Sequence, residues 1–135
     1  MAQPQAKFKF KGYRVIKSEL HITPGIEIDK KLNVSFSGLK AFEADSEYIL
    51  DLGTEISNED KSLNISLEMR GVFEFDRDLS DKEKNDFFTG SAPAIMFPYL
   101  RAHVSVLTSI SGIESILLPT LNFSAGLRNA KKTNS

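Results

Sequence analysis

The chain has 135 residues, a formal net charge of −1 and no cysteine. This length is typical of a single domain, and the balanced charge gives no electrostatic reason to expect nucleic acid as a partner. Without cysteine there is no disulfide, thiolate nucleophile or cysteine-ligated metal, which suits a reducing cytoplasm. The stretch before Tyr13 lacks the apolar region of a signal peptide, and no apolar run approaches the ~20 residues of a membrane span. We therefore expect a cytoplasmic protein that is not inserted into a membrane.

Apolar and polar residues alternate through most of the first half of the chain, which predicts β-strands. The pattern begins at Phe8, and Gly12 marks an expected bulge in the first strand. A second strand starts at Leu32, and a third covers Tyr48–Ile56. The fourth strand is the clearest, because every odd position of Leu63–Phe75 is apolar or glycine and most even positions are polar. We expect this strand to have one face covered and one face in water.

Helical signals follow the fourth strand. Ser80 and Glu83 have the spacing of a capping box, which predicts a short helix. We expect residues 89–91 to end this helix and Pro93, near the next N-terminus, to open a long one. Ser111, followed by glycine, is the predicted end of the long helix.

Four strands followed by helices predict an α+β fold in two layers. We assign residues 1–135 to one domain, with the sheet at residues 7–78 and the helical layer at 80–123. Residues 1–6 and 124–135 are expected to be loose ends.

The long helix has an unusually wide apolar surface. At 100° per residue the apolar arc covers roughly 220°, about twice the stripe that a surface helix needs. One sheet cannot cover this arc, so we expect the helix to lie between its own sheet and a second copy of the chain. The residues assigned to this interface are Ile95, Met96, Tyr99, Leu100, His103, Val104, Val106, Leu107 and Ile110. Arg101, on the polar side of the helix, is expected at an interface or at a cap.

The sequence contains no recognisable catalytic or metal-binding pattern. Neither His21 nor His103 lies at a ligand spacing from another histidine. Asp76, Asp78 and Asp81 are not followed by the closing glutamate of a calcium loop, and there is no glycine-rich phosphate loop. The basic residues near the two ends are too few to favour nucleic-acid binding. We expect no enzymatic activity, no cofactor and no metal.

Two irregular segments carry more apolar residues than connections usually do. Ordinary loop packing is one interpretation; the other is a groove for extended apolar polypeptide, in which each buried side chain would contribute about 1.5–3 kcal/mol. Several grooves on one oligomer would bind better together through effective concentration. The candidate client-binding residues are Ile22, Ile26, Ile28, Phe42, Ile113, Ile116, Leu117, Leu118 and Leu121.

Three motifs resemble the SecB family of preprotein-export chaperones. Ile95–Arg101, IMFPYLR, is similar to the (I/L)-(L/M)-F-P-Y-x-R run of the first long helix of that family. Leu118–Phe123, LPTLNF, is similar to the element that ends the family's helix connection. Arg70–Phe73, RGVF, is similar to the Gly-(I/V)-Phe end of the fourth strand. The resemblance covers about Phe8 to Phe123.

The resemblance implies a four-stranded antiparallel Greek-key sheet with helices packed on one face. It further implies a homotetramer, built as a dimer of dimers with the long helices at the subunit interface, and no ATPase activity. Clients of the family are unfolded polypeptides held in hydrophobic grooves, which are lined by the first connection and by the segment linking the helices. These two segments correspond to Ile22–Ile28 and Ile113–Leu118.

The sequence departs from the family at the acidic docking positions, in the second long helix and in the first connection, which is shorter and lacks the aromatic found in some members. Export members dock the motor ATPase SecA through acidic residues on the outward faces of the first and fourth strands. The corresponding fourth-strand residues are Asn64 and Ser66, both uncharged, and we expect the nearby Glu19 to lie out of register with the family's acidic positions. Docking of a SecA-type motor is therefore left open by the sequence. The second long helix of the family is cut short, with Gly126 and a basic tail in its place.

These observations favour an ATP-independent holdase for unfolded polypeptides, with preproteins for export as one client class. A dedicated chaperone for the antitoxin of a toxin–antitoxin pair is an alternative. A second alternative, outside the chaperones, is an oligomeric adaptor that binds a folded partner. The sequence leaves the choice between these, and between a tetramer and a dimer, open.

Overall fold

The computed structural model describes residues 8–29, 31–44, 46–76 and 78–119, and of residues 37–44 the backbone alone. Four strands precede a helical region, as predicted. The elements are β1 (Phe8–Ile22), β2 (Leu32–Ala44), β3 (Glu47–Asn58), β4 (Leu63–Phe75), α1 (Asp81–Asp86), the π-helical turn η1 (Phe87–Ser91) and α2 (Ala92–Ile110).

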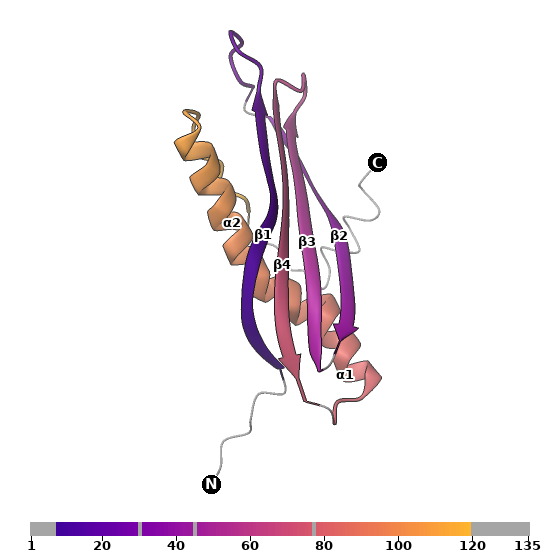
Figure 1. Ribbon diagram of the computed structural model, residues 1–135. Coiled ribbons are helices and arrows are strands. Elements are labelled where there is room, and N and C mark those ends of the chain that lie inside the picture. The colour runs from indigo at the N-terminus through magenta and orange to yellow at the C-terminus, as the bar shows by residue number, and fades with distance from the viewer. Residues whose placement is uncertain (1–7, 30, 45, 77, 120–135) are drawn as a thin grey trace.

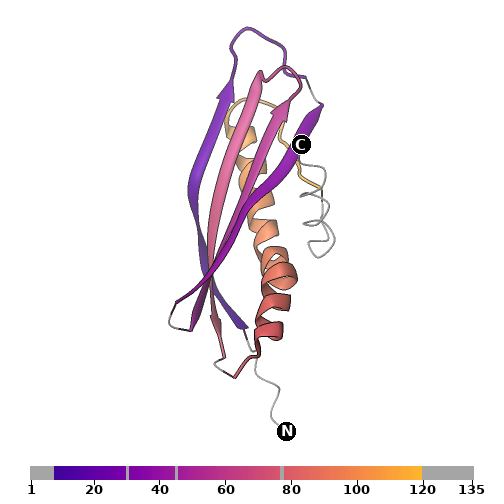
Figure 2. The same ribbon diagram turned by 90° about the vertical axis from the view of Figure 1, so that its right-hand side faces the viewer.

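The four strands form one antiparallel sheet in the order β1-β4-β3-β2. Strands β2, β3 and β4 follow one another as hairpins, whereas β1 lies beside β4 and reaches β2 through the long connection at residues 23–31. This arrangement is a Greek key, which confirms the predicted topology. The helices lie on one face of the sheet, and α2 crosses that face obliquely (Figures 1 and 2).

The register of β1 shifts twice against β4, at Phe10/Gly12 and at Val15/Lys17. Each shift inserts a residue, so the side chains that face the helices change from even to odd positions and back to even. Gly12, at the first shift, has a φ of 133°, a region that glycine adopts at low cost. The bulge predicted at Gly12 is therefore confirmed.

The core lies between β3, β4 and α2. All seven odd positions of Leu63–Phe75 are buried, as the alternation predicted. Met96, Leu100 and Val104 of α2 are fully buried against this face. These three residues belong to the core of the protomer, which corrects their assignment to an interface between copies: the chain's own sheet covers this part of the apolar arc.

The capping box at the start of α1 is present, with the Glu83 backbone N–H donating to Ser80 Oγ at 3.2 Å. The predicted break at residues 89–91 is wrong, because the chain continues from α1 into α2 through the π-helical turn η1. The wider turn brings two consecutive aromatic rings against the sheet. Phe87 stacks on Phe8 with ring centroids 3.6 Å apart, and the Phe88 and Tyr48 centroids are 3.5 Å apart. In the described part of the chain, no helix has the length and apolarity needed to cross a membrane.

Candidate functional site

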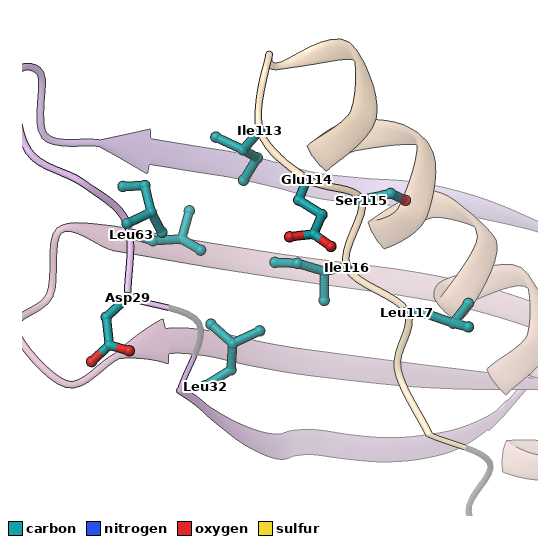
Figure 3. Close-up of a pocket in the computed structure, with 9 residues that line it drawn as sticks. Asp29, Leu32, Leu63, Ile113, Glu114, Ser115, Ile116 and Leu117 are labelled. Carbon is teal, nitrogen blue, oxygen red and sulfur yellow. The ribbon is translucent and has the colours of Figure 1, made fainter.

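The chain reverses direction after α2. Gly112 has a φ of 84°, and the backbone N–H groups of Ser111 and Gly112 bond to the carbonyls of Thr108 and Ser109. The predicted end of the helix is therefore confirmed. Residues Ile113–Pro119, called here the returning segment, then run back along α2, as Figure 3 shows for residues 113–117.

The returning segment is fastened to α2 by side chains that lie four and three residues apart on the helix. Arg101 Nε donates to the Leu118 carbonyl at 2.6 Å. The Ser105 and Ser115 hydroxyls are 2.8 Å apart, and the Ile116 backbone N–H donates to Thr108 Oγ1 at 2.9 Å. We call Arg101, Ser105 and Thr108 the polar clamp. Residues at this spacing share one helix face, so the polar side of α2 faces its own chain.

An apolar pocket of about 440 Å³ opens between the returning segment and the β1–β2 connection. This volume falls within the ~300–1,000 Å³ range of ligand sites in proteins. Its residues are Ile28, Asp29, Leu32, Leu63, Ile113, Glu114, Ser115, Ile116 and Leu117 (Figure 3). The connection and the start of β2 form one wall, and the returning segment forms the other. Two carboxylates, Asp29 and Glu114, lie at an otherwise mainly apolar site.

Four of the nine candidate client-binding residues line this pocket: Ile28, Ile113, Ile116 and Leu117. Ile22 is half-buried against the core, and Ile26 is half-exposed outside the pocket lining. Leu118 is only 1% exposed, which corrects its assignment to the client surface: its side chain fills the core. The side chain of Phe42 and the whole of Leu121 lie outside the described residues.

Sequence reasoning missed Leu32 and Leu63, although a signal for them existed. Each is the first residue of its strand, and both strands begin at the same end of the antiparallel sheet, where Ile22 pairs with Leu63. If the four predicted strands are arranged in the Greek-key order, Leu32 and Leu63 fall at the end of the sheet where the first connection lies. The sequence carried no such signal for the polar clamp, because the groups to which the clamp side chains bond are mainly backbone N–H and carbonyl groups.

The part of the apolar arc that the chain's own sheet does not bury lies on the outer face of α2. Ile110 and Val106 are 77% and 58% exposed, whereas Ile95 and Tyr99 are 37% and 40% exposed. The Tyr99 ring also packs on Tyr13 of β1, with ring centroids 4.6 Å apart. His103 and Leu107 are half-buried, and the His103 Nε2 atom lies 3.0 Å from the Ser18 hydroxyl of β1. The described residues therefore leave this apolar stripe on α2 partly open to solvent, most of all at Val106 and Ile110.

Glu19 lies on the outward face of the sheet, beside the residues of β4 that correspond to the family's docking positions. Glu19 pairs directly with Ser66, and Ser66 Oγ donates to Glu55 Oε1 at 2.7 Å from the neighbouring strand. Two carboxylates thus flank Ser66 across β1, β4 and β3. The second bulge in β1 gives Glu19 this outward orientation, and its expected offset from the family's acidic positions stays a prediction.

The ionisable groups of the described residues include two with a shifted pKa, Arg70 and Asp60. No group of three or more potential metal ligands occurs in this part of the chain. The pKa of Arg70 is raised by its hydrogen bonds to the buried Asp51, at 2.8 and 2.9 Å. The pKa of Asp60 is lowered by hydrogen bonds from Ser62. Neither residue lines the apolar pocket, and both act within the sheet and its turns.

Comparison with known proteins places this architecture among the SecB-like α+β proteins. The family model described as preprotein translocase subunit SecB matches residues 14–134, and the chain belongs to this family. The protein-export protein SecB of Orientia tsutsugamushi (strain Boryong) is 26% identical over 137 residues, covering 99% of this chain and 83% of the relative. An uncharacterised protein of Methanocaldococcus jannaschii is 27% identical over 139 residues, covering 97% of this chain and 89% of the relative.

A solved structure shares the fold. The Mycobacterium tuberculosis SecB-like chaperone, in complex with a ChAD peptide from the HigA1 antitoxin, aligns with a TM-score of 0.68. The match covers 85% of this chain and 88% of the solved chain, with 14% sequence identity. At this identity the likeness establishes the fold, and the sequence match establishes the family.

Proposed function

We propose that this protein is an ATP-independent chaperone that holds non-native polypeptide in the pocket between the returning segment and the β1–β2 connection. The observation that carries the proposal is an apolar pocket built from two connections in a SecB-family chain. Membership of this family supports a chaperone role and a function other than catalysis. Preproteins awaiting export are one client class, which would place the activity in the cytoplasm.

The energetics favour binding at several sites at once. Leu117 is 68% exposed beside the pocket, and covering such a side chain contributes about 1.5–3 kcal/mol before the client's loss of entropy. One pocket would therefore hold an extended segment weakly. Several pockets on one assembly would raise the affinity through effective concentration, without any new contact.

The exposed stripe on α2 supports such an assembly. Its members are Ile95, Tyr99, His103, Val106, Leu107 and Ile110, which remain our candidates for the contact between copies. An apolar surface of this kind is typical of a protein–protein contact rather than of a solvated helix face. We propose a homo-oligomer, arranged as a dimer of dimers, in which α2 packs against α2 of another copy.

A client-suppression assay tests the function. Leu117→Asp places a charge where an apolar client side chain would pack, at an exposed position that the fold tolerates, and Leu117→Met is the matched apolar control. We expect the wild type and Leu117→Met to suppress aggregation of a thermally unfolded model protein, and Leu117→Asp to lose most of that suppression. Equal suppression by Leu117→Asp would remove the pocket from the proposal. Absence of suppression by the wild type would contradict the holdase function.

A dedicated antitoxin chaperone is the second candidate, favoured by one observation. The solved SecB-like chaperone that shares this fold is bound to a peptide of an antitoxin. An antitoxin client would compete for the same pocket. Tight binding of one antitoxin, together with poor suppression of unrelated proteins, would favour this candidate over a general holdase.

A further inference from the structure

The backbone of the returning segment is hydrogen-bonded to α2 on both sides of the exposed Leu117. The Ile116 N–H is held by Thr108 of α2, and the Leu118 carbonyl is held by Arg101. The Leu118 side chain is also buried in the core. Leu117 lies between these anchors at the edge of the pocket, is 68% exposed, and points to the opposite side of the segment from Ile116 (Figure 3).

The clamp side chains are themselves held in place. Thr108 is fully buried, and its hydroxyl donates to the Val104 carbonyl at 2.8 Å, which leaves its oxygen aimed at the Ile116 N–H. Ser115 Oγ also donates to the Ser105 carbonyl at 3.1 Å. Of these bonds only the one from Thr108 to the Val104 carbonyl is fully buried, whereas the bonds that join the clamp to Ile116 and Leu118 are partly buried. A polar group that is shielded from water and loses its partner is costly, so these bonds hold the segment.

The opposite wall of the pocket is held in another way. In the described part of the β1–β2 connection, the hydrogen bonds lie near its two ends: the Thr23 N–H donates to the Ser62 carbonyl, and the Lys31 N–H donates to Asp29 Oδ1. Between these ends, Ile28 contributes a half-buried side chain to the pocket. One wall is therefore anchored by backbone hydrogen bonds at Ile116 and Leu118, on either side of Leu117. The described part of the other wall has its hydrogen bonds near its two ends.

We propose that Arg101 and Thr108 are positioning residues for client binding, because they fix the returning segment so that Leu117 is presented on a preorganised backbone. This inference rests on the proposed function. Ordering one residue costs about 1–2 kcal/mol of backbone entropy, so a segment ordered in advance spares the client that cost. If the clamp hydrogen bonds are removed, the same residues still line the pocket, but the backbone of the returning segment is no longer held in one conformation.

The test compares substitutions that remove the clamp with substitutions that keep its chemistry. Thr108→Val removes the acceptor for the Ile116 N–H, and Thr108→Ser retains a hydroxyl. Arg101→Ala removes the donor to Leu118, and Arg14→Ala, at an exposed arginine on β1, is a control for the same change of charge. The probe is fluorescently labelled, reduced and carboxymethylated α-lactalbumin, a polypeptide that stays unfolded. Each variant is measured for probe affinity, for amide hydrogen exchange at Ile116, and for oligomer size and circular dichroism.

We expect Thr108→Val and Arg101→Ala to bind the probe about tenfold more weakly, the scale of one lost, partly buried hydrogen bond. Their Ile116 exchange should accelerate while oligomer size and circular dichroism stay unchanged. Thr108→Ser and Arg14→Ala should bind like the wild type. Wild-type affinity in both clamp variants, despite faster Ile116 exchange, would overturn the inference and leave the holdase function standing. A wild-type protein that does not bind the probe would overturn the proposed function, and the inference with it.

Discussion

Gly71 of β4 lies directly under Met96 of α2: a Cβ built on Gly71 would be 2.6 Å from the Met96 Sδ atom. Contacts under 3.0 Å are not tolerated by real Cβ atoms, so the close approach of the helix to the sheet requires glycine here. Met96 is fully buried, so its side chain would have to shift within the packed core to admit this Cβ. The helix and the fourth strand are fitted to one another at this pair.

We therefore expect Gly71→Ala to lower the free energy of unfolding by about 1–3 kcal/mol, the usual cost of overpacking a core. Gly90→Ala is the matched control, because a Cβ at Gly90 would have no atom within 4 Å. Urea unfolding followed by circular dichroism measures both variants. A Gly71→Ala protein as stable as the wild type would show that the helix can shift at no cost.

The β3–β4 turn should contribute a pH-dependent part of the stability. Asp60 Oδ1 accepts hydrogen bonds from the Ser62 hydroxyl at 2.7 Å and from the Ser62 N–H at 3.0 Å, and these lower the Asp60 pKa from its ordinary value of 3.8. Because the folded pKa is the lower one, this stabilisation is complete above pH 3.8 and is lost as the pH falls through the folded pKa.

Asp60→Asn should remove that acid-sensitive part of the stability. We expect the variant to be less stable than the wild type near neutral pH, with the difference shrinking towards zero in strong acid. Glu59→Gln removes a carboxylate from the same turn and serves as the control. A stability difference that does not change with pH would contradict this role for Asp60.

The stripe on α2 can be tested apart from the pocket. Val106→Asp combined with Ile110→Asp puts charges into the proposed contact between copies, at positions that are already exposed in the single chain. We expect dissociation into smaller species with unchanged circular dichroism, since buried unpaired charge is costly. Ala94→Asp, at an exposed position outside the stripe, should leave the assembly intact. Light scattering after size-exclusion chromatography distinguishes the two results.

The sequence predicted those features that depend on periodicity. The alternation of Leu63–Phe75 identified the covered face of β4, because a period of two maps directly onto one side of a sheet. The capping box at Ser80 and the glycine after Ser111 marked helix ends through local hydrogen bonding. The continuity through η1 was missed, since no local signal shows that Phe87 and Phe88 both find aromatic partners on distant strands.

The apolar arc of α2 was identified correctly and divided incorrectly. A helical wheel gives the width of an apolar surface, whereas only the packed structure shows which part the chain's own sheet covers. In the structure Met96 and Val104 are buried in the core, whereas Val106 and Ile110 are exposed. The sequence did not identify the partner of Arg101 for a related reason. Arg101 donates to the Leu118 carbonyl, and because every residue has a backbone carbonyl, no residue type marks the acceptor.

Sedimentation velocity of the purified protein, alone and with the unfolded α-lactalbumin probe, tests the central claim most directly. We expect an oligomer that carries the probe with it, because the exposed α2 stripe joins copies and the pocket holds the client. A monomer that sediments separately from the probe would contradict both the assembly and the holdase function.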